Sequence, residues 1–287
     1  MKLGFTRSEA VPNLYFKVED DKPLILVLYV DDLFLTGAYP LIHKCKRELA
    51  SEFEMKDQGL EVWQKPREIF LSQGKYVVNI LERFGMMDCK PVTTLRILTF
   101  RSYMVVMSDQ TWEIPLSFKN SFALMFLVNL RPNICFAVSI VSSYLVEPHW
   151  IDARNLLRCL QDTISHGLRY TAGDVRLLGY TDVDWAGSVV DRKSTSGCCF
   201  TLGSASISWM SRKQKSVALS TAEAEYIAAS MAFCEAIWLR KLFSELFGFT
   251  LDTTVILCNN QRWDSIIEES RIRQLLQQID IILDMVS

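Results

Sequence analysis

The sequence predicts a mixed protein, α+β and α/β in class, in which short sheets alternate with packed helices. Short apolar runs with β-branched residues and polar turns occur near both ends of the chain, which is typical of strands. Other stretches repeat apolar residues at helical spacing. The 287 residues are 49% hydrophobic and contain only 12 Gly and 8 Pro. That composition suits one large core or two domains, and it excludes a disordered or collagen-like chain.

Charge and cysteine usage narrow the function classes. Thirty-one basic and thirty-three acidic residues leave a net charge of −2, which excludes coating of nucleic acid by bulk positive charge. Eight cysteines without a Cys-x-x-Cys spacing, and three histidines, form no zinc ligand set and indicate free thiols in a reducing compartment. The N-terminus lacks the apolar core of a signal peptide. We therefore expect an intracellular protein, cytoplasmic or nuclear and not secreted.

The first region, residues 1–91, predicts a hairpin followed by a helix. Residues 13–18 and 24–29 read as strands around an acidic turn, and residues 33–37 read as a further strand. The following helix, residues 41–53, would bury Cys45, Leu49 and Phe53 on one face.

The second region, residues 92–171, reads as mostly helical, although residues 93–118 show no clear period. The apolar run 122–146 is interrupted by Arg131-Pro132-Asn133, so its pieces are shorter than a membrane-spanning helix and predict a buried helix pair. We expect no membrane association. Residues 152–166 predict a helix that ends at Gly167.

The third region, residues 172–287, predicts three consecutive antiparallel strands, 177–182, 197–202 and 206–211, followed by a long helix. The helix runs from Ser220 to about Phe247 and ends at Gly248. A fourth strand, 254–258, and a weakly patterned helical tail complete the region, with 262–287 not assignable in detail. The apolar stripe expected on the long helix comprises Ile227, Met231, Cys234, Trp238 and Leu242.

A pair of adjacent carboxylates, Asp31 and Asp32, stands in the segment Tyr29-Val30-Asp31-Asp32 between two apolar strands. Two neighbouring carboxylates repel each other unless a cation or solvent offsets their charge, and Mg²⁺ held by carboxylates and phosphates does so. A solvated acidic hairpin turn is the alternative interpretation. The apolar flanks favour a cleft.

Long stretches of the chain resemble the Pol polyprotein of copia-type retrotransposons. LYVDDLFLTG resembles the palm of that family's reverse transcriptase, and LLGYTDVDWAG with LSTAEAEYIAAS resembles its ribonuclease H domain. The resemblance implies a partial palm over residues 1–91 and a thumb- or connection-like helical region over 92–171. It implies a ribonuclease H-like mixed sheet with packed helices over 172–287, truncated at its C-terminal end.

The resemblance implies a ribonuclease H site that binds two Mg²⁺ ions. Asp182 is the expected first ligand, with Asp184 as the alternative. Glu225 is the expected second ligand, because the competing Glu223 belongs to a capping box with Ser220.

Two further ligand positions of this site are altered. Asn259 stands where the family has an aspartate, so one negative charge is lost from the site. Asp280 matches the fourth carboxylate, although Gln278 replaces the neighbouring histidine.

The polymerase half lacks the family's first palm aspartate, so Asp31 and Asp32 form an incomplete metal site. We therefore expect no DNA synthesis and doubtful ribonuclease H activity. The alternatives are a non-enzymatic nucleic-acid-binding remnant and an unstable expressed relic. Expected partners are an RNA–DNA hybrid or other nucleic acid, and Pol or Gag products of related elements. Basic side chains expected to contact phosphates are Arg192, Lys193, Arg212, Lys213 and Lys215.

Overall fold

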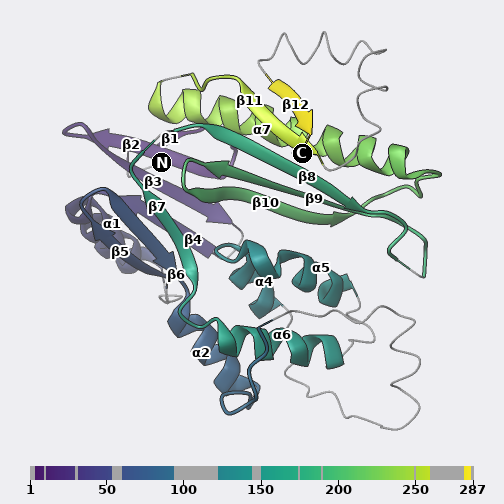
Figure 1. Ribbon diagram of the computed structural model, residues 1–287. Coiled ribbons are helices and arrows are strands. Elements are labelled where there is room, and N and C mark those ends of the chain that lie inside the picture. The colour runs from purple at the N-terminus through teal and green to yellow at the C-terminus, as the bar shows by residue number, and fades with distance from the viewer. Residues whose placement is uncertain are drawn as a thin grey trace. The chain divides into compact units, whose positions relative to one another are not determined.

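The computed structural model contains three separate β-sheets with helices packed on them (Figure 1), which confirms the mixed fold class predicted from the sequence. The residues it describes are 4–9, 11–29, 32–53, 60–93, 122–143, 150–173, 175–188, 190–248, 250–258 and 281–285. Backbone contacts group the chain into two compact units, residues 1–57 with 237–251 and residues 58–236 with 252–287.

The first sheet has the order β1-β2-β3-β4 and is antiparallel throughout. The predicted hairpin is confirmed, because β2 and β3 are joined by Asp20 and Asp21, whose φ angles of 51° and 56° suit a tight hairpin turn. Helix α1 packs on the sheet through Cys45 and Leu49, as expected, but Phe53 follows the helix and is 60% exposed. The elements are β1 (Thr6–Arg7), β2 (Leu14–Glu19), β3 (Lys22–Tyr29), β4 (Asp32–Gly37) and α1 (Tyr39–Glu52).

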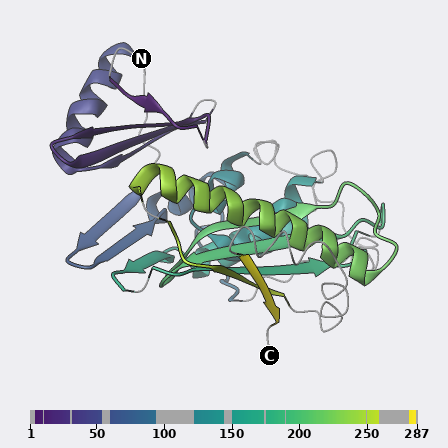
Figure 2. The ribbon, with the colours of Figure 1, turned by 90° about the horizontal axis from the view of Figure 1, so that it is seen from above.

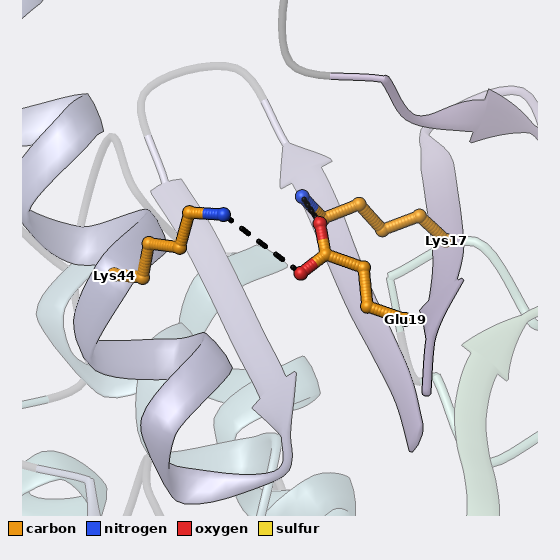
Figure 3. Close-up of polar contacts among 3 residues, drawn as sticks. All are labelled: Lys17, Glu19 and Lys44. Atoms are coloured by element: carbon orange, nitrogen blue, oxygen red, sulfur yellow. Dashed lines mark hydrogen bonds and ion pairs between the residues drawn. The ribbon is translucent and has the colours of Figure 1, made fainter. Parts of the chain in front are cut away.

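An ion-pair cluster links the sheet to its helix (Figure 3). The Glu19 carboxylate accepts a hydrogen bond from Lys17 Nζ at 2.8 Å and lies 3.9 Å from Lys44 Nζ on α1. The hydrogen bond from Lys17, with the positive charge of both lysines, lowers the pKa of Glu19. The cluster joins strand and helix at the rim of the small core.

The second sheet joins segments that are distant in sequence. Strands β5 (Glu61–Lys65) and β6 (Glu68–Ser72) form a hairpin, and β7 (Gly167–Thr171) pairs antiparallel with β6. Gly167 is required at this pairing, because a Cβ there would collide with the carbonyl oxygen of Leu71 and the ring of Phe70. The sequence analysis assigned Gly167 as a helix stop, but α6 ends at Asp162 and Gly167 begins a strand.

Five helical segments form the apolar core of the middle of the chain. They are α2 (Gly74–Arg83), α4 (Phe122–Val128), η2 (Pro132–Ile134), α5 (Cys135–Ser143) and α6 (Trp150–Asp162). The expected break at Arg131-Pro132 is confirmed, since a short 3₁₀ turn separates α4 from α5. Within the described ranges, no helix is both long enough and apolar enough to cross a bilayer. Fully buried side chains here include Val77, Leu81, Leu127, Ile134, Leu156 and Leu160.

Arg131 is the largest fully buried side chain of this core. Its guanidinium donates to Thr163 Oγ1 at 2.9 Å, to the Ile164 carbonyl at 3.2 Å and to the His166 carbonyl at 3.4 Å. These acceptors follow the end of α6, where carbonyl groups lack helical partners. Arg131 therefore fastens the α4–α5 junction to the C-terminal end of α6.

The third sheet has the order β10-β9-β8-β11-β12. Strands β8, β9 and β10 form the predicted antiparallel meander, and β11 pairs parallel with both β8 and β12. Helix α7 (Thr221–Phe247) connects β10 to β11, and its part up to Ala236 belongs to the same compact unit as the sheet (Figure 2). Trp209 on β10 donates its indole N–H to the Val128 carbonyl at 2.7 Å, which ties this sheet to α4. The strands are β8 (Leu177–Asp184), β9 (Thr195–Leu202), β10 (Ala205–Lys213), β11 (Thr254–Cys258) and β12 (Ile281–Met285).

The buried face of α7 differs from the predicted stripe. The expected Cys234 is exposed and Trp238 is 37% exposed, whereas a row of alanines at i, i+4 spacing is buried. Alanine is apolar but small, so a helix can approach a sheet closely along an alanine face. The end of α7 is confirmed, with Gly248 at φ 68°. The buried alanines are Ala224, Ala228, Ala232 and Ala236.

The helical interpretation of the C-terminal tail is wrong over residues 281–285, which form β12 parallel to β11. Every residue of Ile281–Met285 has a backbone partner on Thr254–Cys258. The segment begins with the apolar run Ile281, Ile282 and Leu283. Such a short run is compatible with a parallel strand as well as with a helix. Residues 259–280 lie outside the described residues.

The burial of the alanine face of α7 predicts that Ala232→Leu destabilises the protein. Ala232 is fully buried, so the added methylenes must displace packed neighbours, and we expect a loss of about 1–3 kcal/mol in the free energy of unfolding. Ser230→Leu on the exposed side of the same helix is the matched control and should change stability by less than about 0.5 kcal/mol. Urea unfolding compares the three proteins. Equal stabilities of the two variants would contradict the close packing of side chains around Ala232.

The contacts of Arg131 predict that Arg131→Met destabilises the helical core by about 1–3 kcal/mol, because Thr163 Oγ1 and the carbonyls of Ile164 and His166 lose their donor. Arg154→Met serves as control, since Arg154 is exposed on α6. Thermal unfolding followed by circular dichroism measures both variants. If Arg131→Met and Arg154→Met unfold at the same temperature, the guanidinium does not hold the α4–α5 junction.

Candidate functional site

Two acidic residues stand near the end of β8, the central strand of the third sheet. Asp182 pairs with Gly197 and Asp184 with Thr195 on β9, and because they are two residues apart both side chains lie on one face. Both side chains are exposed. The Asp184 carboxylate packs directly over Gly187, where a Cβ would collide with it. The C-terminal end of this central strand thus carries a pair of carboxylates.

The first turn of α7 contributes a third acid, Glu225, which interacts with Asp182 near this end of β8. The predicted N-cap is confirmed, since the Glu223 backbone N–H donates to Ser220 Oγ at 3.1 Å. The Glu223 carboxylate accepts the Leu219 backbone N–H at 2.7 Å, so this residue serves the helix start. Glu225 lies two residues further on and is only 8% exposed.

Gln214 holds the first turn of α7 against the sheet. Its side-chain Nε2 donates to the Ala224 carbonyl at 2.8 Å and to Ser196 Oγ on β9 at 2.9 Å. Its backbone N–H donates to the Ser194 carbonyl at 2.8 Å. Gln214 is 3% exposed, so these hydrogen bonds are shielded from water. The sequence analysis did not single out Gln214, because a glutamine within the basic run Arg212–Lys215 gives no pattern signal.

The electrostatics of the site centre on Glu225. Burial, together with the negative charge of Asp182, raises the pKa of Glu225 to about 7, while a hydrogen bond from the Cys258 thiol acts in the opposite direction. Cys258 Sγ lies 3.9 Å from Glu225 Oε2, and β11 ends at Cys258 beside Thr181 of β8. Burial and the charge of Asp182 also raise the pKa of Asp184. The site therefore carries more negative charge than its surroundings compensate.

The other predicted ligands of this site are not described. Asn259 and Asp280 lie outside the described residues, so their distances to Asp182 and Glu225 are not assigned. Within the described part of the chain, no group of three or more His, Cys, Asp or Glu side chains is arranged to hold a metal ion. Cys258, which the sequence analysis treated only as a free thiol, contacts Glu225, and its signal was its place immediately before Asn259.

The predicted polymerase residues are described only in part. Asp32 begins β4 and its backbone pairs with Tyr29, the last residue of β3. Asp31 lies outside the described residues.

The predicted basic contacts lie near the third sheet in different settings. Arg192, at φ 56°, and Lys193 belong to the loop between β8 and β9. Lys213 Nζ pairs with Asp191 at 2.9 Å. Burial opposes ionisation of Asp191, but the contact with Lys213 and the hydrogen bond from the Lys193 backbone N–H outweigh it and lower the pKa of Asp191 to about 2. Lys213 is therefore partly neutralised. The predicted basic residues whose side chains are exposed are Arg192, Arg212 and Lys215.

Comparison with known proteins agrees with the sequence motifs. A family model for reverse transcriptase (RNA-dependent DNA polymerase) matches residues 1–97. An uncharacterized mitochondrial protein of Arabidopsis thaliana is 36% identical over 75% of this chain and 94% of its own length. The Pol polyprotein of transposon TNT 1-94 from Nicotiana tabacum is 35% identical over 96% of this chain. The chain belongs to the copia-type retrotransposon Pol family.

Membership of this family identifies the chain as retrotransposon-derived reverse transcriptase sequence. The Pol polyprotein of transposon RE1 from Arabidopsis thaliana is also similar, with 32% identity over 91% of this chain. The chain spans about a fifth of the length of these two polyproteins, 22% of the first and 18% of the second.

The raised pKa of Glu225 predicts a pH-dependent effect of Glu225→Gln. Below the unfolded-state pKa of about 4.5 the carboxyl group is protonated in both states and the substitution changes little. Between about 4.5 and 7 the unfolded chain ionises first, and above about 7 the folded state carries a disfavoured charge. We therefore expect Glu225→Gln to stabilise the metal-free protein by about 1–3 kcal/mol at pH 8, with the gain vanishing near pH 4.5.

Thermal unfolding between pH 4.5 and 8 checks this expectation. Glu223→Gln is the matched control on the same helix turn, because glutamine also accepts the hydrogen bond of a capping box. If Glu225→Gln raised the stability equally at every pH, the raised pKa of Glu225 would be contradicted.

Proposed function

We propose that residues 172–287 form a ribonuclease H-like domain whose Mg²⁺-dependent hydrolysis of the RNA strand of RNA–DNA hybrids is impaired by Asn259. The observation that supports this proposal is the convergence of two carboxylates from different elements, Asp182 on β8 and Glu225 on α7. Burying a carboxyl group beside a second carboxylate costs stability, and acids with such perturbed pKa values are frequent at functional sites. The motif resemblance of LLGYTDVDWAG and LSTAEAEYIAAS supports the same assignment.

The residues present fit a hard divalent cation. Carboxylate oxygens are the ligands that Mg²⁺ prefers, and the raised pKa of Glu225 reflects negative charge that a cation would offset. Asp182 and Glu225 would hold Mg²⁺, with Asp280 as a further ligand. When bound, Mg²⁺ polarises the scissile phosphate and activates water for its hydrolysis. Asn259 offers only a neutral amide oxygen, so it weakens occupancy by the cation.

Other residues of the chain would orient the hybrid. Arg192, Arg212 and Lys215 are exposed and suit contacts with the phosphate backbone, which dominates recognition of an A-form-like duplex. Lys193 and the partly neutralised Lys213 complete the proposed basic set. Gln214 and the alanine face of α7 act by positioning Glu225.

The proposal extends to the N-terminal part of the chain. We propose that residues 1–91 are a partial reverse-transcriptase palm and that residues 92–171 are its connection. Asp31 and Asp32 would supply part of the two-metal clamp of such a palm. All eight cysteines are free thiols, which supports action in a reducing compartment of the cell.

The second candidate function is binding of nucleic acid without turnover. The neutral side chain of Asn259, next to Cys258 at the end of β11, favours it. Nucleic-acid substrates and other products of related elements would be its partners. The third alternative, a relic that does not fold, predicts the absence of a cooperative unfolding transition.

A reversion experiment tests the proposal. We expect wild-type protein to cleave a labelled RNA–DNA hybrid in Mg²⁺ at background rate and Asn259→Asp to cleave it about 100-fold faster or more, because the restored carboxylate completes the negative site. Asn260→Asp is the matched control, since it adds the same charge one residue later.

Each outcome of this assay has a consequence. Cleavage by Asn259→Asp alone supports an intact scaffold with a damaged site. Hybrid binding without cleavage in any variant supports the binding remnant. Wild-type cleavage that Glu225→Gln abolishes would contradict the proposed impairment.

A further inference from the structure

A second candidate site lies on the second sheet, away from the carboxylates of β8 and α7. A cavity of about 540 Å³ opens between the β5–β6 hairpin, the start of α2 and the turn after α6. That volume is sufficient for one nucleotide-sized ligand. Its walls include Glu61, Trp63, Phe70, Ser72, Lys75 and Ile164.

One wall of the cavity is aromatic. Trp63 and Phe70 are direct cross-strand partners, with ring centroids 5.5 Å apart and planes inclined by 36°. Arg169 on β7 lies over the Phe70 ring at 5.6 Å, so Phe70 is held between the guanidinium and the indole. Trp63 is 49% exposed. Arg169, Phe70 and Trp63 thus form a stack across the three strands, and the exposed indole of Trp63 is accessible to a planar ligand.

A carboxylate stands beside the indole. Glu61 precedes Trp63 by two residues, so both side chains lie on the same face of β5. Glu61 Oε2 accepts the Lys75 backbone N–H at a long 3.4 Å, and Oε1 lies 3.6 Å from Lys75 Nζ. Both contacts are weak by distance, so the carboxylate keeps lone pairs for other donors. A Cβ at Gly74 would lie 2.9 Å from Glu61 Oε2, so the absence of a side chain there lets the carboxylate approach α2.

We propose that this cavity binds an unpaired guanine base. Guanine has two adjacent N–H donors, N1–H and N2–H, that match the two oxygens of one carboxylate, whereas adenine and cytosine each present a single amino group beside an acceptor. The base stacks on Trp63, as unpaired bases do on aromatic side chains in nucleic-acid-binding proteins. Lys75, whose side chain is 79% exposed, is available to the phosphate of the same nucleotide. The site rests on contacts of the second sheet and is independent of the proposed ribonuclease H-like activity.

Binding of mononucleotides to the full chain tests the guanine site. Isothermal titration with guanosine, inosine and cytidine 5′-monophosphates compares bases that differ in their donors, since inosine lacks the 2-amino group. We expect a dissociation constant near ~1 mM for the guanosine nucleotide and binding about fivefold or more weaker for inosine and cytidine. Trp63→Ala and Glu61→Gln should each weaken guanosine binding about tenfold.

Gln64→Ala is the matched control, because Gln64 is exposed on the opposite face of β5 and its loss should leave affinity within about twofold. A labelled single-stranded RNA with one guanine distinguishes a free nucleotide from a base within a strand. Binding of this RNA that guanosine monophosphate displaces, and that Trp63→Ala weakens, assigns the site to a strand.

Equal affinity for guanosine and inosine nucleotides, or guanosine binding that survives Trp63→Ala, would overturn the proposal. RNA binding unaffected by both Trp63→Ala and Glu61→Gln would likewise exclude this cavity as the site. The cavity shares no residue with the carboxylate site of β8 and α7, so the outcome is separable from that of the hydrolysis assay.

Discussion

Burial of the Glu225 carboxyl group beside the negative charge of Asp182 is the constraint on which the candidate site of the third sheet depends. A buried acid beside a second negative charge resists ionisation, and its raised pKa of about 7 expresses that cost. The fold supports the arrangement from several directions. Gln214 fixes the first turn of α7, the Ser220 cap sets where the helix begins, and the Cys258 thiol donates toward the Glu225 carboxylate. A chain that only needed a stable core would gain by an apolar residue at position 225.

Close packing of α7 makes this juxtaposition possible. Alanines at i, i+4 spacing form the buried side of the helix, where a larger side chain would have to displace packed neighbours. The N-terminal turn of the helix then brings Glu225 within electrostatic reach of β8. Packing, capping and electrostatics are consequently not independent here, because each determines where the carboxylate of Glu225 lies.

Local sequence patterns predict much of the third sheet and of the helix α7 that carries Glu225. Alternation of apolar and polar residues predicts the meander, Ser220 predicts the N-cap of α7, and Gly248 predicts where this helix ends. These features depend on residues that are neighbours in the sequence. Asp182 and Glu225 were chosen from motif resemblance combined with the capping role of Glu223. The buried face of α7 was misjudged because hydropathy gives weight to Met231 and Trp238, whereas packing selects small alanines.

Non-local pairings were beyond sequence reasoning. Strand β7 pairs with β6 across almost a hundred residues, and nothing within Gly167–Thr171 announces that partner. The strand β12 was read as helical because a short apolar run does not reveal its period. Gln214 and the stacked Trp63, Phe70 and Arg169 likewise acquire meaning only when the fold brings their partners close. These contacts are set by tertiary structure and leave no periodic trace in the chain.

The coupling of Asp182 to Glu225 can be measured directly. A carbon-13 NMR titration of the Glu225 side-chain carboxyl, in metal-free wild-type protein and in Asp182→Asn, reports the ionisation of that one group. The account predicts an apparent pKa of about 7 in the wild type and a clearly lower value in Asp182→Asn, because one source of the repulsion is removed. An ordinary glutamate pKa in the wild type, or a value that Asp182→Asn does not change, would contradict it.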